Sequence, residues 1–355
     1  MLNFAVGPVL CDSDILAVGS QQLPYFRTKE FSEVSKENEK IFLELIGACE
    51  GSKAIFLTGS GTASMEASVM NVFSEKDRVL VINGGGFGKR FGDICAVHGI
   101  PHDEVVLEQG KTLTKEQLYS FDGANYTGLL VNMHETSTGV LYDVEMIGEY
   151  CRKYNLFFVV DAISSFLADE LYMAKWGIDI AFTGSQKALA LPPGLSVMAL
   201  SPRAIRRVFD GEVKSYYFNL KEYLQNGERG QTPFTPAVGI MLQLNLRLRK
   251  IRERGIENER EHIKLIASDF RKRIEHMPLE IFSNSLSNAV TPVMPTNGMS
   301  AQDIFEKLKD EYDIFICPNG GNLKDKVFRV GHIGSLTVED NIRLVEALKN
   351  VMGEE

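Results

Sequence analysis

Between residues 40 and 235, short apolar runs alternate with stretches in which apolar residues recur at helical spacing. Seven of these runs have the length and composition of buried β-strands. Such alternation is typical of βαβ units, in which helices cover both faces of a mostly parallel sheet. We therefore predict an α/β fold built on one broad, seven-stranded sheet. The predicted strands are 54–57, 78–82, 103–107, 128–132, 157–160, 178–182 and 195–200, and the predicted helices include 63–73, 90–98 and 144–154.

The pattern changes after Pro236. A long helical stretch with charged faces occupies about 239–276, and four short apolar runs then alternate with two further helices. We expect a smaller C-terminal α/β domain that is entered through a connecting helix. The predicted division is an N-terminal arm at 1–15 that joins the small domain, a large domain at 16–238 and a small domain at 239–355. The four apolar runs are 279–282, 290–294, 314–316 and 328–330.

Composition and charge narrow the class of protein. Apolar residues make up 44% and charged residues 24% of the 355 residues, an ordinary balance for a globular protein. The formal charge of −9 argues against a protein that binds the phosphate backbone of nucleic acids. Residues 247–254 are rich in arginine, but acidic and apolar residues interrupt and follow them, which favours a solvated amphipathic helix.

Cysteine usage and hydropathy indicate the compartment. The five cysteines stand far apart, with no C-x-x-C spacing and an odd count, which suits free thiols in a reducing cytosol rather than a disulfide framework or a zinc site. The N-terminus carries no basic leader, and no apolar run approaches the roughly 18 residues of a membrane span. We expect a cytoplasmic protein with no membrane or nucleic-acid partner and no bound metal.

Two strand ends carry the most informative chemistry, because ligands of α/β sheets bind beyond the carboxyl ends of the strands. Residues 183–189 place Lys187 in a small, nearly uncharged neighbourhood directly after the run 178–182. Partial burial lowers the pKa of such an amine and lets it attack a carbonyl. Asp161 ends the run 157–160. A lysine and a carboxylate are the two protein groups that pyridoxal phosphate chemistry requires; taken alone, Lys187 also fits an ordinary surface residue.

A glycine-rich turn at 59–62 follows the first predicted strand and opens a helix. Bare backbone N–H groups at a helix N-terminus suit a phosphate group. In the alternative interpretation, Ser60 or Thr62 only caps the helix. A dinucleotide site fits less well, because Ser64 occupies the third glycine position of that fingerprint.

Three more positions complete the candidate list. Phe87 lies among glycines, where its ring is able to stack on a flat heterocycle or to serve as a staple at a helix start. Thr136 lies in a hydroxyl-rich turn and is a candidate to bond a cofactor oxygen, whereas His134 and Glu135 beside it also fit an internal pair. Arg329 lies inside an apolar strand and needs an anionic partner, either a substrate carboxylate or a structural acid.

With these residues assembled, the chain resembles the class V aminotransferases of the fold-type I pyridoxal phosphate enzymes. The resemblance is to the branch of alanine–glyoxylate, serine–pyruvate and 2-aminoethylphosphonate transaminases, and it covers nearly the whole chain. The motifs that carry it are GSGT (59–62), GGGFGKR (84–90), HETSTG (134–139), VVDAISS (159–165), SQKAL-x-LPPG (185–194) and FRVGHIG (328–334).

The resemblance implies a role for each matching residue. It makes Lys187 the Schiff-base lysine and Asp161 the partner of the ring nitrogen, while Arg329, assisted by Gly7, binds the substrate carboxylate. It also implies a homodimer with shared active sites, in which Thr232 and Thr235 reach the neighbour's phosphate. The remaining cofactor-binding residues that it implies are Ser60, Gly61, Thr62, Phe87, Thr136, Ile163 and Gln186.

The expected function is a ping-pong amino transfer from a small amino acid or an aminophosphonate to a 2-oxo acid such as pyruvate or glyoxylate. Lys187 would remove and return the proton. One alternative keeps the cofactor and makes the chain a cysteine desulfurase or lyase that uses Cys317 as the sulfur acceptor. A nicotinamide-dependent oxidoreductase, or a binding module without catalysis, is the alternative from another class.

Overall fold

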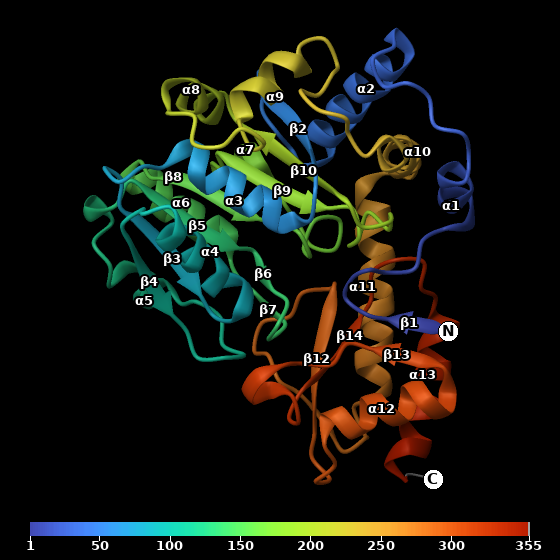
Figure 1. The fold of residues 1–355 in the computed structure, drawn as a ribbon. Coiled ribbons are helices and arrows are strands. Elements are labelled where there is room, and N and C mark those ends of the chain that lie inside the picture. The colour runs from blue at the N-terminus through green and yellow to red at the C-terminus, as the bar shows by residue number, and fades with distance from the viewer. Residues whose placement is uncertain (354–355) are drawn as a thin grey trace.

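A computed structural model describes residues 1–353, and its central feature is a seven-stranded sheet with the strand order β2-β10-β9-β8-β5-β3-β4 (Figure 1). Every predicted strand belongs to this sheet. Its strands are β2 Lys53–Thr58, β3 Val79–Asn83, β4 His102–Val106, β5 Gly128–Asn132, β8 Phe157–Asp161, β9 Ile180–Gly184 and β10 Leu195–Leu200. Only β10 runs antiparallel to its neighbours, so the predicted mostly parallel α/β fold is confirmed.

The predicted strand at 178–182 begins two residues late, at Ile180. The N–H group of Ile178 bonds instead to the carbonyl of Met173, the first residue of a short helix that ends at Trp176. Asp179 bonds to Phe158 through both its backbone N–H and its carboxylate. These local bonds delay the start of the strand, which the apolar pattern alone does not reveal.

Helices cover both faces of the sheet and enclose two apolar cores. One core lies under α3, α4, α8 and α9, and the other under α1, α2, α5, α6, α7 and α10. The helices are α1 Ser13–Gly19, α2 Lys29–Leu45, α3 Gly61–Val72, α4 Gly86–Val97, α5 Lys115–Tyr119, α6 Val144–Tyr154, α7 Met173–Trp176, α8 Pro202–Asp210, α9 Leu220–Gly227 and α10 Val238–Arg254. Across residues 1–353, none of the helices is both long and apolar enough to span a membrane.

The long helix predicted at 239–276 is wrong as a single element. It is two helices, α10 and α11 (Ile256–Arg273), because Gly255 adopts a φ of +89° and ψ of 136° between them. Glycine reaches this backbone conformation without steric cost, and the N–H of Gly255 closes the last turn of α10 on the carbonyl of Ile251. The apolar pattern continues through the break and conceals it.

The C-terminal elements pack around a third apolar core, to which the N-terminus contributes Leu2 and Phe4. β1 pairs in parallel with β13, and Figure 1 shows its blue strand among the orange and red C-terminal elements. These elements are β1 Leu2–Phe4, β11 Leu279–Ile281, β12 Val290–Pro295, α12 Ala301–Tyr312, β13 Ile314–Ile316, β14 Phe328–Gly331 and α13 Val338–Met352. β11, β12 and β14 form an antiparallel sheet.

The division into domains remains our proposal. The shared core of β1 and the C-terminal elements supports an N-terminal arm that joins a small domain. By contrast, the buried face of α10 packs in the same core as the large sheet, which favours Gly255 over residue 238 as the boundary between the two domains.

Candidate active site

Lys187 lies in the turn after β9, and its side chain is buried, with 8% of its surface exposed. Its Nζ donates a hydrogen bond to the backbone carbonyl of Val6 at 2.6 Å. Gly7 lies against the same side chain, since a Cβ atom there would stand 2.8 Å from Lys187 Cδ. Burial lowers the pKa of Lys187 to about 8, so a larger fraction of the amine is neutral at physiological pH than for a solvated lysine.

Asp161 lies at the carboxyl end of β8, next to β9 in the sheet. Its Oδ1 accepts the N–H of Ile163 at 2.7 Å, and no side chain within residues 1–353 donates to it. Burial raises the pKa of Asp161 to about 7, against the smaller opposing effects of that N–H and of Lys187. A buried carboxylate without a bonded cation suits a ligand that brings a positive charge.

The predicted phosphate turn opens α3. Ser60 is the N-cap residue, but its side chain makes no capping hydrogen bond, so the first N–H groups of the helix are not taken up by this hydroxyl. Gly61 contacts Ile163 so closely that a Cβ atom would lie 2.1 Å from Ile163 Cδ1. Thr62 Oγ1 accepts a hydrogen bond from Arg90 Nη1 at 3.1 Å. Ile163 and the turn thus border the same region.

Phe87 lies in the first turn of α4, which begins four residues before the predicted start at 90. The guanidinium of Arg90 packs on its ring at 4.8 Å from the centroid. The buried carboxylate of Glu135 accepts the N–H groups of Phe87 and Gly88, at 3.1 and 2.9 Å. An acid at the N-terminus of a helix is favourable, and this one fixes the backbone that carries Phe87.

Sequence reasoning missed the roles of Arg90 and Glu135. Glu135 also accepts from Asn132 Nδ2 at 3.0 Å and from the Ser137 hydroxyl, so the alternative interpretation, an internal pair with His134, does not apply. The signal that was available is an acid in a hydroxyl-rich turn directly after a predicted strand. Nothing in the sequence, however, brings residue 135 to residue 87.

Thr136 and Arg329 meet across the site. Nη1 of Arg329 donates to the carbonyl of Thr136 at 2.9 Å, and its Nη2 donates to the carbonyl of Pro318 at 2.7 Å. The Nε of Arg329 is buried and has no partner within residues 1–353. The guanidinium is therefore held by two backbone carbonyls rather than by a structural acid, which leaves its charge available to an anion.

Of the remaining predicted residues, Gln186 bonds to the N-terminal arm, whereas Thr232 and Thr235 lie outside these contacts. The carbonyl of Gln186 accepts the N–H of Val9, and its side-chain Oε1 is buried without a partner in the described chain. The hydroxyl of Thr232 bonds locally to the carbonyl of Phe234 at 2.7 Å, and Thr235 is exposed. Among residues 1–353, no hydrogen bond joins Thr232 or Thr235 to Lys187.

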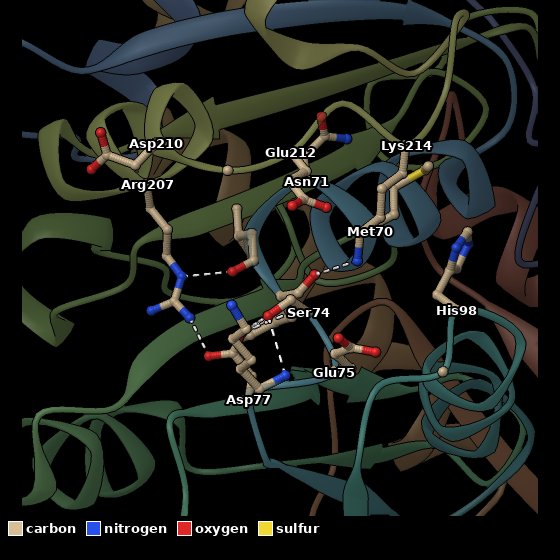
Figure 2. A pocket seen from close by; sticks show the side chains of 15 residues that line it. Met70, Asn71, Ser74, Glu75, Asp77, His98, Arg207, Asp210, Glu212 and Lys214 are labelled. Carbon is tan, nitrogen blue, oxygen red and sulfur yellow. Dashed lines mark hydrogen bonds and ion pairs between the residues drawn. The ribbon is translucent and has the colours of Figure 1, made fainter.

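A separate pocket lies away from these residues (Figure 2). It encloses about 570 Å³ beside the C-terminal end of α3, roughly 17 Å along that helix from the glycine turn. Arg207 bonds there to the carbonyl of Val72 and to Asp77, and Lys214 bonds to the carbonyl of Phe73. These cations bond to backbone carbonyl groups at the C-terminal end of α3. None of the predicted site residues lines the pocket.

Pyridoxal phosphate fits the residues that the fold brings together. Its aldehyde needs a buried amine, such as that of Lys187, and its ring nitrogen needs a buried carboxylate, such as that of Asp161. Phe87 and Ile163 offer apolar surfaces for the ring, and the N-terminus of α3 offers N–H groups for the phosphate. The unpartnered Gln186 Oε1 and Arg329 Nε are buried polar atoms that a bound ligand would satisfy. Fold and site together define a pyridoxal phosphate enzyme of fold type I.

The chain belongs to the aminotransferase class-V family, whose model matches residues 21–322. It is 30% identical to the L-aspartate–glyoxylate aminotransferase of Paracoccus denitrificans, over 82% of this chain and 78% of that protein. It is also 30% identical to a Synechococcus protein named soluble hydrogenase, small subunit, over 85% and 80% of the two chains. The structure of a Thermus thermophilus aspartate aminotransferase of subgroup IV is similar, with 28% identity, a TM-score of 0.92 and 99% of both chains covered.

Family membership confirms the predicted class of enzyme, a pyridoxal-phosphate-dependent aminotransferase, and its cofactor.

Proposed function

We propose that this enzyme transfers the amino group of a small amino acid or aminophosphonate to a 2-oxo acid such as pyruvate or glyoxylate. The observation that carries the proposal is the buried amine of Lys187 between the carbonyl of Val6 and the region of Asp161 and Arg329. A relative named for aspartate and glyoxylate supports a small amino donor and glyoxylate as acceptor.

Each residue would have a separate task. Pyridoxal phosphate, when bound, withdraws electrons from the substrate carbon and makes its proton acidic. Lys187 removes that proton and returns it elsewhere, as base and acid in turn, which its lowered pKa favours. Asp161 holds a proton on the ring nitrogen, and Arg329 orients the substrate through its carboxylate or phosphonate.

The desulfurase alternative requires Cys317 as the sulfur acceptor, and the backbone bonds of this residue argue against that role. Cys317 forms a backbone bridge with Arg329, with mutual N–H···O bonds of 2.9 and 2.8 Å. A sulfur acceptor has to move toward the substrate and away again, whereas this bridge fixes the backbone of Cys317. Aminotransfer therefore remains the better supported function.

A spectroscopic experiment tests the proposal. The purified protein with pyridoxal phosphate should absorb in the visible range, and borohydride should remove that band by fixing the cofactor to Lys187. The band should bleach on addition of L-alanine, L-serine, L-aspartate or 2-aminoethylphosphonate, and return on addition of glyoxylate or pyruvate. Lys187→Ala should show neither change. Retention of amino transfer in Lys187→Ala, or sulfide release from cysteine that Cys317→Ser abolishes, would overturn the proposal.

We also propose that the enzyme is a homodimer whose active sites contain residues of both subunits. An exposed apolar groove of about 740 Å³ supports this, with Thr235 and Val238 on its wall. Leu16 and Leu23 also line it and are 50% and 48% exposed, which is unusual for a monomer surface. A second copy that covers the groove would bury these leucines and bring Thr232 and Thr235 toward a neighbouring phosphate.

Subunit mixing tests the shared site. Lys187→Ala and the double variant Thr232→Ala/Thr235→Ala should each have little activity alone. A hybrid dimer of the two contains one site with an intact lysine and intact threonines. Equal mixing after mild dissociation makes about half of the dimers hybrids, so it should restore up to about a quarter of the wild-type activity. A monomer in sedimentation, or a lack of restoration in a verified hybrid, would contradict the proposal.

We further propose a cytoplasmic location. Its support is chemical: Cys11, Cys49, Cys95, Cys151 and Cys317 are all free thiols in the structure. Fractionation of cells that express the tagged protein tests it.

A further inference from the structure

We propose that His134 is a positioning residue that sets the direction of a buried hydrogen-bond chain through Ser164 to Thr136. In this arrangement the hydroxyl of Thr136 must donate outward, to the ring oxygen of the bound cofactor. The inference rests on the proposed role of Thr136 in the cofactor site.

The three side chains form a continuous buried chain. Nδ1 of His134, on β6 (His134–Glu135), lies 3.1 Å from Ser164 Oγ. Ser164 Oγ lies 2.6 Å from Thr136 Oγ1. Each residue has 4% or less of its surface exposed, so water does not compete for these groups. The order of the bonds therefore depends on which atom of the imidazole carries the proton.

The surroundings of His134 decide its protonation. Burial lowers the pKa of His134 to about 3, and the nearby charges of Lys187 on the turn after β9, Arg329 on β14 and Arg271 on α11 act in the same direction. The neighbouring carboxylate of Glu135 bonds to the N–H groups at the start of α4 and not to the imidazole. The imidazole is thus neutral and carries one N–H.

The tautomer follows from the other ring nitrogen. Nε2 of His134 is buried and has no partner within residues 1–353. A buried N–H without an acceptor is costlier and rarer than an unused lone pair. The proton therefore resides on Nδ1 and is donated to Ser164 Oγ.

The rest of the chain is then fixed. Ser164 has two acceptors in reach, Thr136 Oγ1 at 2.6 Å and the carbonyl of His134 at 3.5 Å, and the shorter bond is the better one. With Ser164 donating to it, Thr136 Oγ1 has its own proton free, and no other acceptor in the described chain bonds to that hydroxyl. The hydroxyl is a committed donor, which matches an anionic oxygen on the ring that carries the aldehyde.

This direction has a measurable consequence. The ring oxygen shares the proton on the Lys187 nitrogen once that nitrogen is joined to the cofactor. A hydrogen bond from Thr136 to the oxygen weakens its hold on this proton, so the nitrogen loses the proton at a lower pH. Loss of the directed chain should raise the pH midpoint of the visible absorbance change.

Three variants distinguish a role in setting the direction of the hydrogen bonds from a purely structural role. His134→Leu removes the donor, Ser164→Ala removes the link, and His134→Asn keeps an amide donor near the position of Nδ1. We expect the absorbance midpoint to rise by about one pH unit, a tenfold change in proton affinity, in His134→Leu and Ser164→Ala, but by less than about 0.3 in His134→Asn. Apo-protein melting temperatures and cofactor dissociation constants are measured alongside, because a purely structural role would change those and leave the midpoint alone.

A cofactor-free measurement makes the test independent. Long-range ¹H–¹⁵N spectra of the apo protein report the tautomer of each of the six histidines, and the spectrum of His134→Asn assigns the signal of His134. A proton on Nε2 overturns the proposal, as does an unchanged midpoint in His134→Leu and Ser164→Ala. If the wild type shows no borohydride-sensitive band, both the proposed function and this inference fail. If the wild-type band is normal but the pH midpoint of the variants is unchanged, only this inference fails.

Discussion

The amine of Lys187 and the backbone carbonyl of Val6 are joined by a 2.6 Å hydrogen bond although 181 residues separate them in sequence. The N-terminal arm therefore lies directly over the reactive amine and contributes to its burial. A substrate or cofactor that reaches Lys187 has to replace this hydrogen bond, which makes the arm part of the site.

Gly7→Ala should disturb the lysine. Gly7 has a φ of +131°, and an added Cβ would lie 2.8 Å from Lys187 Cδ and 3.0 Å from Cε. We expect at least a roughly tenfold loss of amino transfer, since small displacements of reacting groups are costly. Gly298→Ala is the matched control, because Gly298 also has a positive φ, of +85°, but no atom within 4 Å of the added Cβ. Equal activity of the two variants would show that the contact between residue 7 and Lys187 does not affect amino transfer.

The capture of pyridoxal phosphate should depend on pH. Burial lowers the pKa of Lys187 to about 8, so the fraction of neutral amine rises as the pH passes through this value. Stopped-flow absorbance of the apo protein mixed with the cofactor should give a rate that increases with a midpoint near pH 8. A midpoint near 10.5, as for a solvated lysine, would show that the amine is not desolvated.

Asp161→Asn should stabilise the apo protein at high pH. Burial raises the pKa of Asp161 to about 7 from an ordinary value of 3.8. The folded protein keeps a proton that the unfolded chain loses over this range, so the stability contributed by this group falls as the pH rises from about 4 to 7 and stays low above 7. At about 1.4 kcal/mol per pKa unit, the substitution should increase the free energy of unfolding by roughly 2–3 kcal/mol more at pH 8 than at pH 5.

Denaturant unfolding of the apo protein at the two pH values measures this difference. The exposed Asp303→Asn is the control and should show no such dependence. The same Asp161→Asn protein should lose amino transfer at least about a hundredfold, because the ring nitrogen loses its partner. Unchanged activity would remove Asp161 from the site.

Glu135→Gln should weaken cofactor binding. The substitution keeps the shape of the side chain but removes the charge that holds the N–H groups of Phe87 and Gly88. A loss of roughly 1.4 kcal/mol, the scale of one charge-assisted bond, would raise the dissociation constant of pyridoxal phosphate about tenfold. Glu145→Gln, which changes an exposed partner of Lys175, should leave that constant unchanged.

Arg329→Lys should raise the KM for the amino donor at least tenfold and alter kcat less. A lysine keeps the positive charge but cannot bridge the carbonyls of Thr136 and Pro318 while it binds a carboxylate. Steady-state kinetics with both substrates varied separate the two constants. If kcat falls as much as kcat/KM, the arginine acts in the transition state rather than in substrate binding.

The apolar pattern was sufficient to find every strand of the large sheet, because the five inner strands are almost wholly buried and the edge strands β2 and β4 still contain short apolar runs. It also placed Lys187 and Asp161 at neighbouring strand ends, which parallel topology brings together. It did not find the break at Gly255, since one glycine does not interrupt the pattern. Nor did it find Glu135 or Arg90 beside Phe87, because these contacts depend on the packing of α4 against a distant turn.

The pairing of β1 with β13 connects the segment that bonds to Arg329 with the segment that contacts Lys187. β13 leads directly into Cys317, whose backbone is bonded to Arg329, and β1 leads directly to Val6 and Gly7. The guanidinium of Arg329 and the carbonyl that bonds to Lys187 are thus joined through one two-stranded sheet and a few residues of backbone. Before any cofactor is bound, the same small sheet therefore supports both ends of the site.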